Sequence, residues 1–145
     1  MAPENVQFCT FYLGELLLGV EVRHVREVLR EQRVTRVPMA PPMVSGLINL
    51  RGQIITAIDL RKRLQLDSCT STPGRVNIIV RVDQDTMSFM ADAVAEVEEV
   101  QNCSFEPLPE TLKGIARLLV KGVYKLPRQL LLILNPEKVM DLQTP

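Results

Sequence analysis

The chain has 145 residues, of which 46% are hydrophobic and 23% are charged, a length and composition that predict one soluble globular domain. Its 17 basic and 17 acidic side chains give a formal net charge of zero, which argues against capture of nucleic acid or anionic membrane through overall charge. The longest uncharged run, 37–50, contains three prolines and is shorter than the roughly 20 apolar residues of a spanning helix. We therefore expect no insertion into a membrane.

The N-terminal region and the cysteines indicate a cytoplasmic protein. No Lys or Arg precedes Arg23, whereas a secretory signal begins with a basic region. The cysteines, Cys9, Cys69 and Cys103, are odd in number and widely spaced. This pattern predicts neither structural disulfides nor a zinc site.

The neutral total is the sum of oppositely charged regions. Residues 1–63 carry nine basic and six acidic side chains, residues 83–110 carry eight acidic and no basic ones, and residues 113–138 carry six basic against one acidic. Because charged patches select partners, this distribution favours a protein with several protein-binding surfaces.

The first third of the chain predicts a β-hairpin followed by a helix. Residues 6–13 and 16–20 are strand-like runs around a possible turn at Gly14. In residues 21–33 the apolar side chains recur at helical spacing, which predicts an amphipathic helix of two or three turns. The prolines of residues 38–42 end it.

The middle of the chain predicts a second hairpin. Residues 46–50 and 53–60 are β-rich runs around the Arg51-Gly52 turn. Residues 60–66 can form one helical turn, and the polar residues 67–74 predict a loop that divides the chain into halves.

The second half repeats this theme with further strands and one terminal helix. Eight or so short strands with few helices predict a small-barrel architecture, and two barrels that share an interface accommodate them better than one core. The predicted strands are 75–82, 87–92, 94–100, 116–126 and 129–134, with a turn at 83–86, a loop at 107–114 and a helix at 136–142 that has Pro136 in its first turn.

The sequence contains no arrangement typical of an active site. His24 is the only histidine, and we expect it on the charged face of the predicted helix. Ser45-Gly46 lacks the glycines of a nucleophile elbow, and no glycine cluster could cradle a phosphate. We expect no catalysis, no metal and no cofactor. A hydrolase that uses His24 with one of the three cysteines remains as an alternative.

Five arginines recur at steps of three and four: Arg23, Arg26, Arg30, Arg33 and Arg36. On a helix they would share one face, either as a docking stripe or as a solvated face with Glu27 and Glu31 as partners. The stripe supports an alternative function, a nucleic-acid-binding small-barrel protein. The low aromatic content of 4% disfavours it because bases need stacking platforms.

Arg51 is the other charged residue that the pattern singles out. It occupies a tight turn between two apolar runs, where Gly52 supplies backbone freedom. A carboxylate would order the guanidinium, and Glu27 is the natural partner.

In this order the motifs resemble the CheW-like domain of bacterial chemotaxis signalling. The similarity runs through FYLGELLLGVEV (11–22), VRHVREVL (22–29), VTRVPMAPPMVSGLINLRGQIITAIDLRKRL (34–64), DAVAEV (92–97) and RQLLLILNPEKVM (128–140). Departures from the family pattern are Leu18, where an aromatic is common, and Ser88 and Phe89, where a small stretch with a glycine is common.

The resemblance implies a mostly β fold of two intertwined five-stranded SH3-like barrels with short helices. We expect a single domain over 1–145, with the second barrel mainly at about 74–125 and the terminal segments crossing back. The family is non-catalytic, and no cofactor is implied.

The resemblance also implies two protein partners and their sites. Members couple membrane chemoreceptors to the CheA histidine kinase. The positions that match the groove for the receptor's cytoplasmic hairpin tip are Val25, Glu27, Arg51 and Val97. Those that match the surface for the kinase's regulatory domain are Val34, Arg36, Val37 and Ser45. The chain would be cytoplasmic and would reach the membrane only through these partners.

Overall fold

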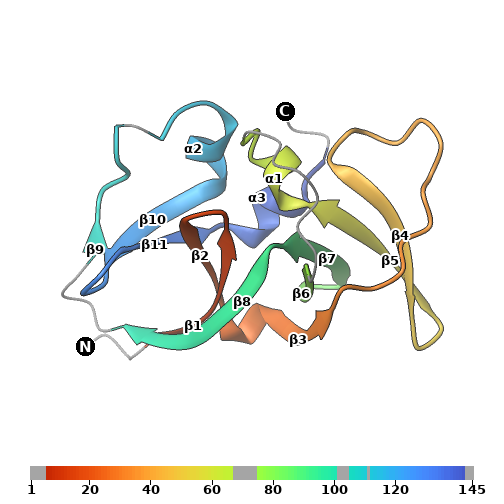
Figure 1. The fold of residues 1–145 in the computed structure, drawn as a ribbon, viewed down its shortest axis with the longest axis horizontal. Helices are drawn as coiled ribbons and strands as arrows, with labels where there is room; N and C mark the ends of the chain where they lie inside the picture. The colour runs from red at the N-terminus through yellow and green to blue at the C-terminus, as the bar shows by residue number, and fades with distance from the viewer. Residues whose placement is uncertain (1–5, 67–74, 101–104, 111, 143–145) are drawn as a thin grey trace.

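The computed structural model describes residues 6–66, 75–100, 105–110 and 112–142, which form a mostly β fold of two sheets (Figure 1). The first sheet has six strands, in the order β8 (Ala93–Val100), β1 (Val6–Leu13), β2 (Leu16–Glu21), β11 (Leu130–Leu134), β10 (Val120–Lys125) and β9 (Phe105–Glu106). The second has five, in the order β3 (Val25–Arg30), β6 (Val76–Val82), β7 (Asp85–Ala91), β5 (Gln53–Asp59) and β4 (Val44–Leu50).

The two sheets differ in sequence range from the two expected barrels. The second sheet is a continuous stretch from β3 to β7, and the chain returns to the first sheet at Asp92. The expected second barrel at 74–125 is therefore divided, because β6 and β7 pair with β3 and β5 whereas β8 pairs with β1. The parallel pairs β5–β7 and β2–β11 join strands within each sheet that are far apart in the sequence. Periodicity within one strand does not reveal such pairing.

The helix predicted at 21–33 is wrong. A single 3-10 turn, η1 (Val22–His24), leads directly into strand β3. Val25, Glu27 and Leu29 are half-buried and pair with β6, whereas the residues between them are exposed. The valines at 25 and 28 suit a strand, and pairing with β6 overrides the helical spacing of the apolar residues.

The strand predicted at 116–126 is also partly wrong. Residues Ile115–Leu119 form the short helix α2, and strand β10 begins only at Val120. Ile115, Ala116 and Leu119 are buried, and these positions share one face of a helix.

The two other predicted helical segments are confirmed. Helix α1 (Leu60–Arg63) is capped by Asp59, whose carboxylate accepts a 3.0 Å hydrogen bond from the Arg61 N–H. Helix α3 (Pro136–Met140) has proline in its first turn, and the Asn135 side chain caps it. The predicted loop at 67–74 lies outside the described residues. Among the described residues, no helix has the length and apolar character needed to cross a membrane.

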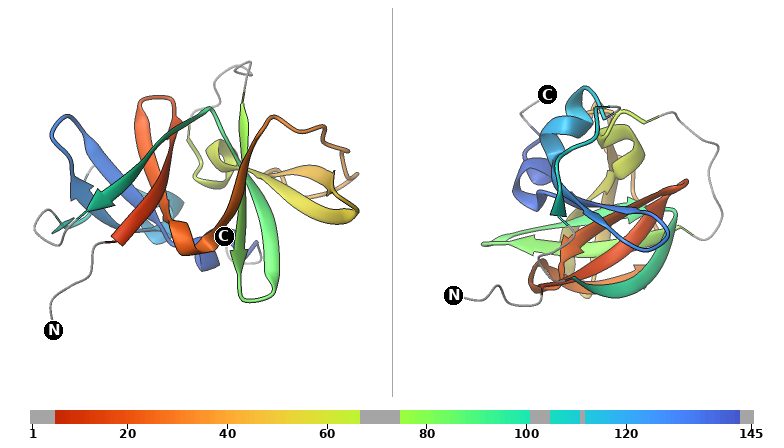
Figure 2. Two further views of the ribbon diagram at one scale, coloured as in Figure 1. Left: turned by 90° about the horizontal axis from the view of Figure 1, so that it is seen from below. Right: turned by 90° about the vertical axis from the view of Figure 1, so that its left-hand side faces the viewer.

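One hydrophobic core joins the two sheets. It contains Phe11 and Leu18 from the first sheet and Ile58, Ile78 and Phe89 from the second, each at most 1% exposed. Figure 2 shows the two sheets side by side, with the helices at the junction. Because the chain crosses between the sheets twice, burial of this core fixes the position of one sheet against the other.

The family departures noted in the sequence all lie in the interior. Leu18 and Phe89 fill the shared core, and Ser88 is fully buried. The Ser88 hydroxyl accepts a 2.9 Å hydrogen bond from the Asn77 amide, whose oxygen accepts another from the Gln32 N–H at 2.8 Å. The buried serine therefore satisfies a polar group of the adjacent strand.

Candidate functional site

The structure brings Arg51 and Glu27 together as an ion pair, as expected, although Glu27 comes from a strand and not from a helix. Arg51 occupies the turn between β4 and β5 with φ of +51°, followed by Gly52 with φ of +87°. The Asn49 side chain accepts a 2.9 Å hydrogen bond from the Gly52 N–H and so fixes the turn. The Arg51 side chain is 69% exposed and the Glu27 side chain 28% exposed, so the pair presents its charges at the surface.

A hollow of about 200 Å³ lies beside this pair. Its lining is mostly polar and includes Arg51 and Glu27, whereas the apolar lining residues Ile55 and Ile79 are each only 1% exposed. The other two expected groove residues, Val25 and Val97, do not line this hollow. Of the four positions, the structure therefore assembles only the charged pair in one hollow.

Val97 lies in the other sheet. It is 59% exposed and, with the 48% exposed Val94, forms an apolar surface on β8. Strand β8 is one edge of the first sheet, and β3, which carries Val25 and Glu27, is one edge of the second. Figure 1 shows both edge strands on the lower side of the molecule.

Three of the four expected kinase-facing positions line another hollow. Arg36, Val37 and Ser45 surround a space of about 680 Å³ together with the proline-rich segment 38–42. Val34 instead lies half-buried against the small core of the second sheet. Thr35, which precedes this proline-rich segment, is attached to β4 by two 2.8 Å backbone hydrogen bonds with Leu47.

Close packing at Gly46 allows this attachment. A Cβ atom at Gly46 would lie 2.2 Å from the Thr35 carbonyl oxygen and 2.7 Å from the Val34 side chain. Only glycine fits such a backbone approach, so the position of Arg36 and Val37 depends on this glycine.

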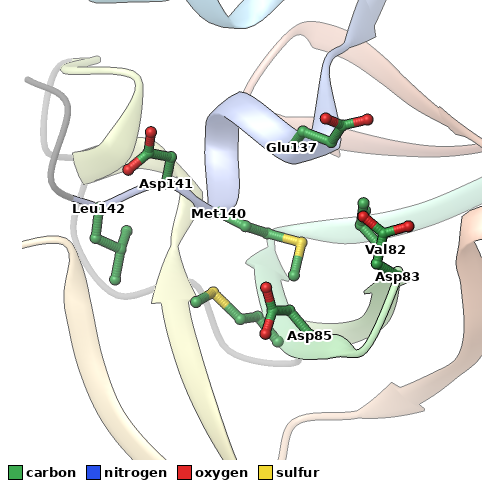
Figure 3. Close-up of a pocket in the computed structure, with 8 residues that line it drawn as sticks. Val82, Asp83, Asp85, Glu137, Met140, Asp141 and Leu142 are labelled. Carbon is green, nitrogen blue, oxygen red and sulfur yellow. The ribbon is translucent and has the colours of Figure 1, made fainter.

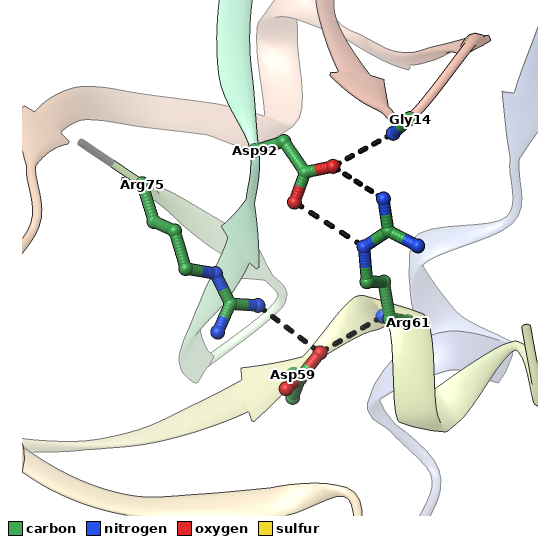
Figure 4. A network of polar contacts seen from close by, with 5 residues as sticks. All are labelled: Gly14, Asp59, Arg61, Arg75 and Asp92. Carbon is green, nitrogen blue, oxygen red and sulfur yellow. Dashed lines mark hydrogen bonds and ion pairs between the residues drawn. The ribbon is translucent and has the colours of Figure 1, made fainter. Parts of the chain in front are cut away.

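A network of charged groups connects the two sheets and was not predicted from the sequence (Figure 4). Asp92, where the chain returns to the first sheet, accepts hydrogen bonds from the Arg61 Nη2 at 2.6 Å and from the Gly14 N–H at 2.7 Å. Asp59 pairs with Arg75 at 3.1 Å. Burial raises the pKa of Asp92, but the contacts with Arg61 and Gly14 outweigh burial and hold this pKa below its usual value. The spacing of Asp92 from Arg61 gives no local signal of this contact.

The expected arginine stripe does not form. Arg23 lies in η1, Arg26 and Arg30 project from the exposed face of β3, and Arg33 and Arg36 follow in irregular backbone. Arg23 pairs with Glu21 at 3.4 Å. Because these residues belong to three different local structures, the helical face on which the nucleic-acid alternative rests is absent.

The residues considered for hydrolysis show no activated nucleophile within the described part of the chain. Cys9 is a free, buried thiol on β1, and burial raises its pKa, which disfavours the reactive thiolate. Cys69 and Cys103 lie outside the described residues. No group of three or more metal-binding side chains is close enough to hold a metal, again among the described residues.

Two sheets around a shared core, with surface hollows and no group of metal-binding side chains among the described residues, define a mostly β module. A family model described as the CheW-like domain matches residues 7–144. The chemotaxis protein CheW of Treponema pallidum is 31% identical over 142 residues, which cover 95% of this chain and 84% of that protein. The chemotaxis protein CheW of Klebsiella aerogenes is 27% identical over 143 residues, 97% of this chain and 86% of that protein.

A solved structure shares both the sequence pattern and the fold. The crystal structure of the scaffolding protein TtCheW from Thermoanaerobacter tengcongensis matches with a TM-score of 0.82 and 31% identity, covering 91% of this chain and 90% of that one. The chain therefore belongs to the CheW-like family. It is a chemotaxis scaffold and not an enzyme.

Proposed function

We propose that this chain couples chemoreceptors to a CheA-type histidine kinase in the cytoplasm. One surface, around Arg51 and Glu27, would bind the cytoplasmic hairpin tip of the receptor, and another, around Arg36, Val37 and Ser45, would bind the regulatory domain of the kinase. The exposed Arg51–Glu27 pair beside a surface hollow is the observation that carries the proposal.

The physical argument begins with the exposure of this pair. An exposed ion pair contributes at most about 1 kcal/mol to stability, so folding alone gives little reason to order Arg51. A helical hairpin tip can place an apolar side chain against the half-buried Leu50 while the charges set its register. The exposed apolar surface at Val94 and Val97 on β8 adds area on which a helix could pack.

Charge reversal tests the receptor surface. We expect Arg51→Glu and Glu27→Arg each to lower binding to a receptor cytoplasmic fragment by at least about tenfold, the effect typical of a central interface residue. The double variant Arg51→Glu/Glu27→Arg keeps an ion pair but exchanges the positions of the two charges. It therefore distinguishes the loss of the ion pair from the loss of its orientation. Arg128→Glu, an exposed reversal in the turn between β10 and β11, is the matched control.

The result is informative only if the variants remain folded, so far-UV circular dichroism must match wild type. Undiminished receptor binding by a folded Arg51→Glu variant would refute the groove assignment.

The kinase surface is tested separately. We expect Arg36→Glu and Val37→Asp to weaken binding of the kinase regulatory domain and to leave receptor binding unchanged, because the two hollows share no lining residue. Loss of both partners in either variant would show that the two surfaces are not independent.

A further inference from the structure

A third hollow, separate from both proposed surfaces, lies between the tip of the β6–β7 hairpin and helix α3. It has a volume of about 470 Å³. Its apolar lining comes from Val82, Met87, Met140 and Leu142. Figure 3 shows carboxylates around these side chains, from Asp83 and Asp85 on the hairpin and from Glu137 and Asp141 on the helix side.

All charged residues that line this hollow in the described part of the chain are acidic, and three lack an ion-pair partner there. Asp83, Asp85 and Glu137 are exposed and form no ion pair among the described residues. By contrast, Glu21, Glu27, Asp59 and Asp92 are each paired with an arginine or lysine. Like charges that gather without counterions repel one another, and a cationic partner would relieve this repulsion.

The arrangement does not fit a metal ion. Within the described residues no three carboxylates converge closely enough to hold one, and the carboxylates are separated by apolar side chains (Figure 3). Methionine side chains are flexible and polarisable, and adapt to varied apolar partners. The hollow thus combines an apolar floor at Met87 and Met140 with a negatively charged rim.

We propose that this hollow is a docking site for a basic amphipathic segment of a partner protein. An apolar side chain of that segment would pack on Met87 and Met140, and flanking Lys or Arg side chains would pair with Asp83, Asp85 and Glu137. The stems of Lys and Arg are themselves apolar, so one side chain can contact both floor and rim. The site is independent of the receptor and kinase surfaces.

A synthetic probe tests the site. The probe is a peptide of about 15 residues with leucine and lysine at helical spacing, compared with a peptide in which glutamate replaces lysine. The protein carries methionines labelled in the methyl group, of which there are six, with Met87→Leu and Met140→Leu used to assign signals. We expect the lysine peptide to shift the Met87 and Met140 signals and the glutamate peptide to shift neither.

Matched neutralisations separate the site from overall charge. We expect Asp85→Asn/Glu137→Gln to weaken the lysine peptide about fivefold, the combined effect of two exposed ion pairs. Glu15→Gln/Glu31→Gln removes the same charge from exposed positions elsewhere and should leave binding unchanged. All four positions are exposed, so both variants should fold.

Four outcomes would overturn the proposal. Equal weakening in the two double variants would mean that only net charge matters, and unmoved Met87 and Met140 signals would place the peptide elsewhere. Calcium chloride that produces the same shifts would indicate a cation site. Self-association in sedimentation that Asp85→Asn/Glu137→Gln abolishes would assign the hollow to a second copy of this chain.

Discussion

Two arginine–carboxylate pairs in this protein differ in burial, and therefore in what they contribute. In the Arg61–Asp92 pair the side chains are 15% and 12% exposed, whereas in the Arg51–Glu27 pair they are 69% and 28% exposed. Burial strengthens a charge-assisted hydrogen bond and raises the cost of losing one partner. The first pair therefore stabilises the fold, whereas the second presents its charges at the surface.

Substitution of Asp92 tests the structural pair. We expect Asp92→Asn to lower the free energy of unfolding by about 1–3 kcal/mol at neutral pH, because the mostly buried Arg61 loses its carboxylate. Chemical denaturation followed by far-UV circular dichroism measures the difference. Asp85→Asn, on an exposed aspartate that forms no ion pair among the described residues, serves as the control.

The pH dependence of this difference follows from the lowered pKa of Asp92. A carboxyl group with a folded pKa below its unfolded value stabilises the native state above the unfolded pKa of about 4. That stabilisation is lost as the pH falls through the lower folded pKa. The difference in the free energy of unfolding between wild type and Asp92→Asn should therefore narrow below about pH 4. A difference that does not change with pH would contradict an ionic role of Asp92.

The structural elements that could be predicted from the sequence are those whose own residues favour them. The hairpins at 6–20 and 46–59 carry both strand composition and a turn residue, and each formed as predicted. The apolar residues of 25–30 fit the spacing of a helix as well as that of a strand, so the spacing alone did not distinguish the two. Pairing with β6 makes this segment a strand. The Arg51–Glu27 contact was still predictable, since it needed only that the two segments meet.

Other long-range contacts could not be predicted from the sequence. Arg63 appeared as one of several basic residues in a helical turn, yet it is 2% exposed. Its guanidinium donates hydrogen bonds to the carbonyls of Lys138, Val139 and Asp141 at 2.8–3.0 Å. Burial lowers the pKa of Arg63, and the nearby Asp141 carboxylate opposes this effect. A single side chain thus attaches the end of α3 to α1.

Removal of this guanidinium should release helix α3. We expect Arg63→Met to destabilise the protein by about 2–4 kcal/mol, because three carbonyls lose their donor. Amide hydrogen exchange should accelerate first at residues 138–141. Lys62→Met, the exposed neighbour on the same helix, should leave both measurements near wild type, and equal effects of the two substitutions would contradict the assignment.

Gly46 tests whether its close packing against Thr35 fixes the segment that carries Arg36 and Val37. We expect Gly46→Ala to cost more than about 2 kcal/mol, since the new Cβ would overlap the Thr35 carbonyl, and to weaken binding of the kinase regulatory domain. Gly114→Ala places its Cβ in open space, although φ of +70° and ψ of −146° form a conformation nearly restricted to glycine, so its cost of about 1–3 kcal/mol is backbone strain without steric overlap. Kinase binding that survives Gly46→Ala would separate this packing from the binding surface.

At the scale of the whole molecule, the order of strands along the chain ties the two sheets into one unit. The second sheet is inserted in the chain between β2 and β8 of the first sheet. Two chain segments therefore connect the sheets, one after β2 and one before β8. The shared core draws Phe11 and Leu18 from one sheet and Ile58 and Phe89 from the other. The proposed binding of two partners would benefit from this rigidity, because it fixes the position of the two proposed surfaces relative to each other.

The two sheets should accordingly unfold in one cooperative transition. The chain has no tryptophan, so Val28→Trp in the second sheet and Leu130→Trp in the first, at positions 36% and 43% exposed, report on each sheet separately. We expect both probes to give the same denaturation midpoint. Ile58→Ala, which empties a fully buried site in the second sheet, should lower stability by about 2–5 kcal/mol and shift both midpoints equally. Midpoints that separate, or a shift confined to the Val28→Trp probe, would mean that the sheets fold independently and that the shared core does not couple them.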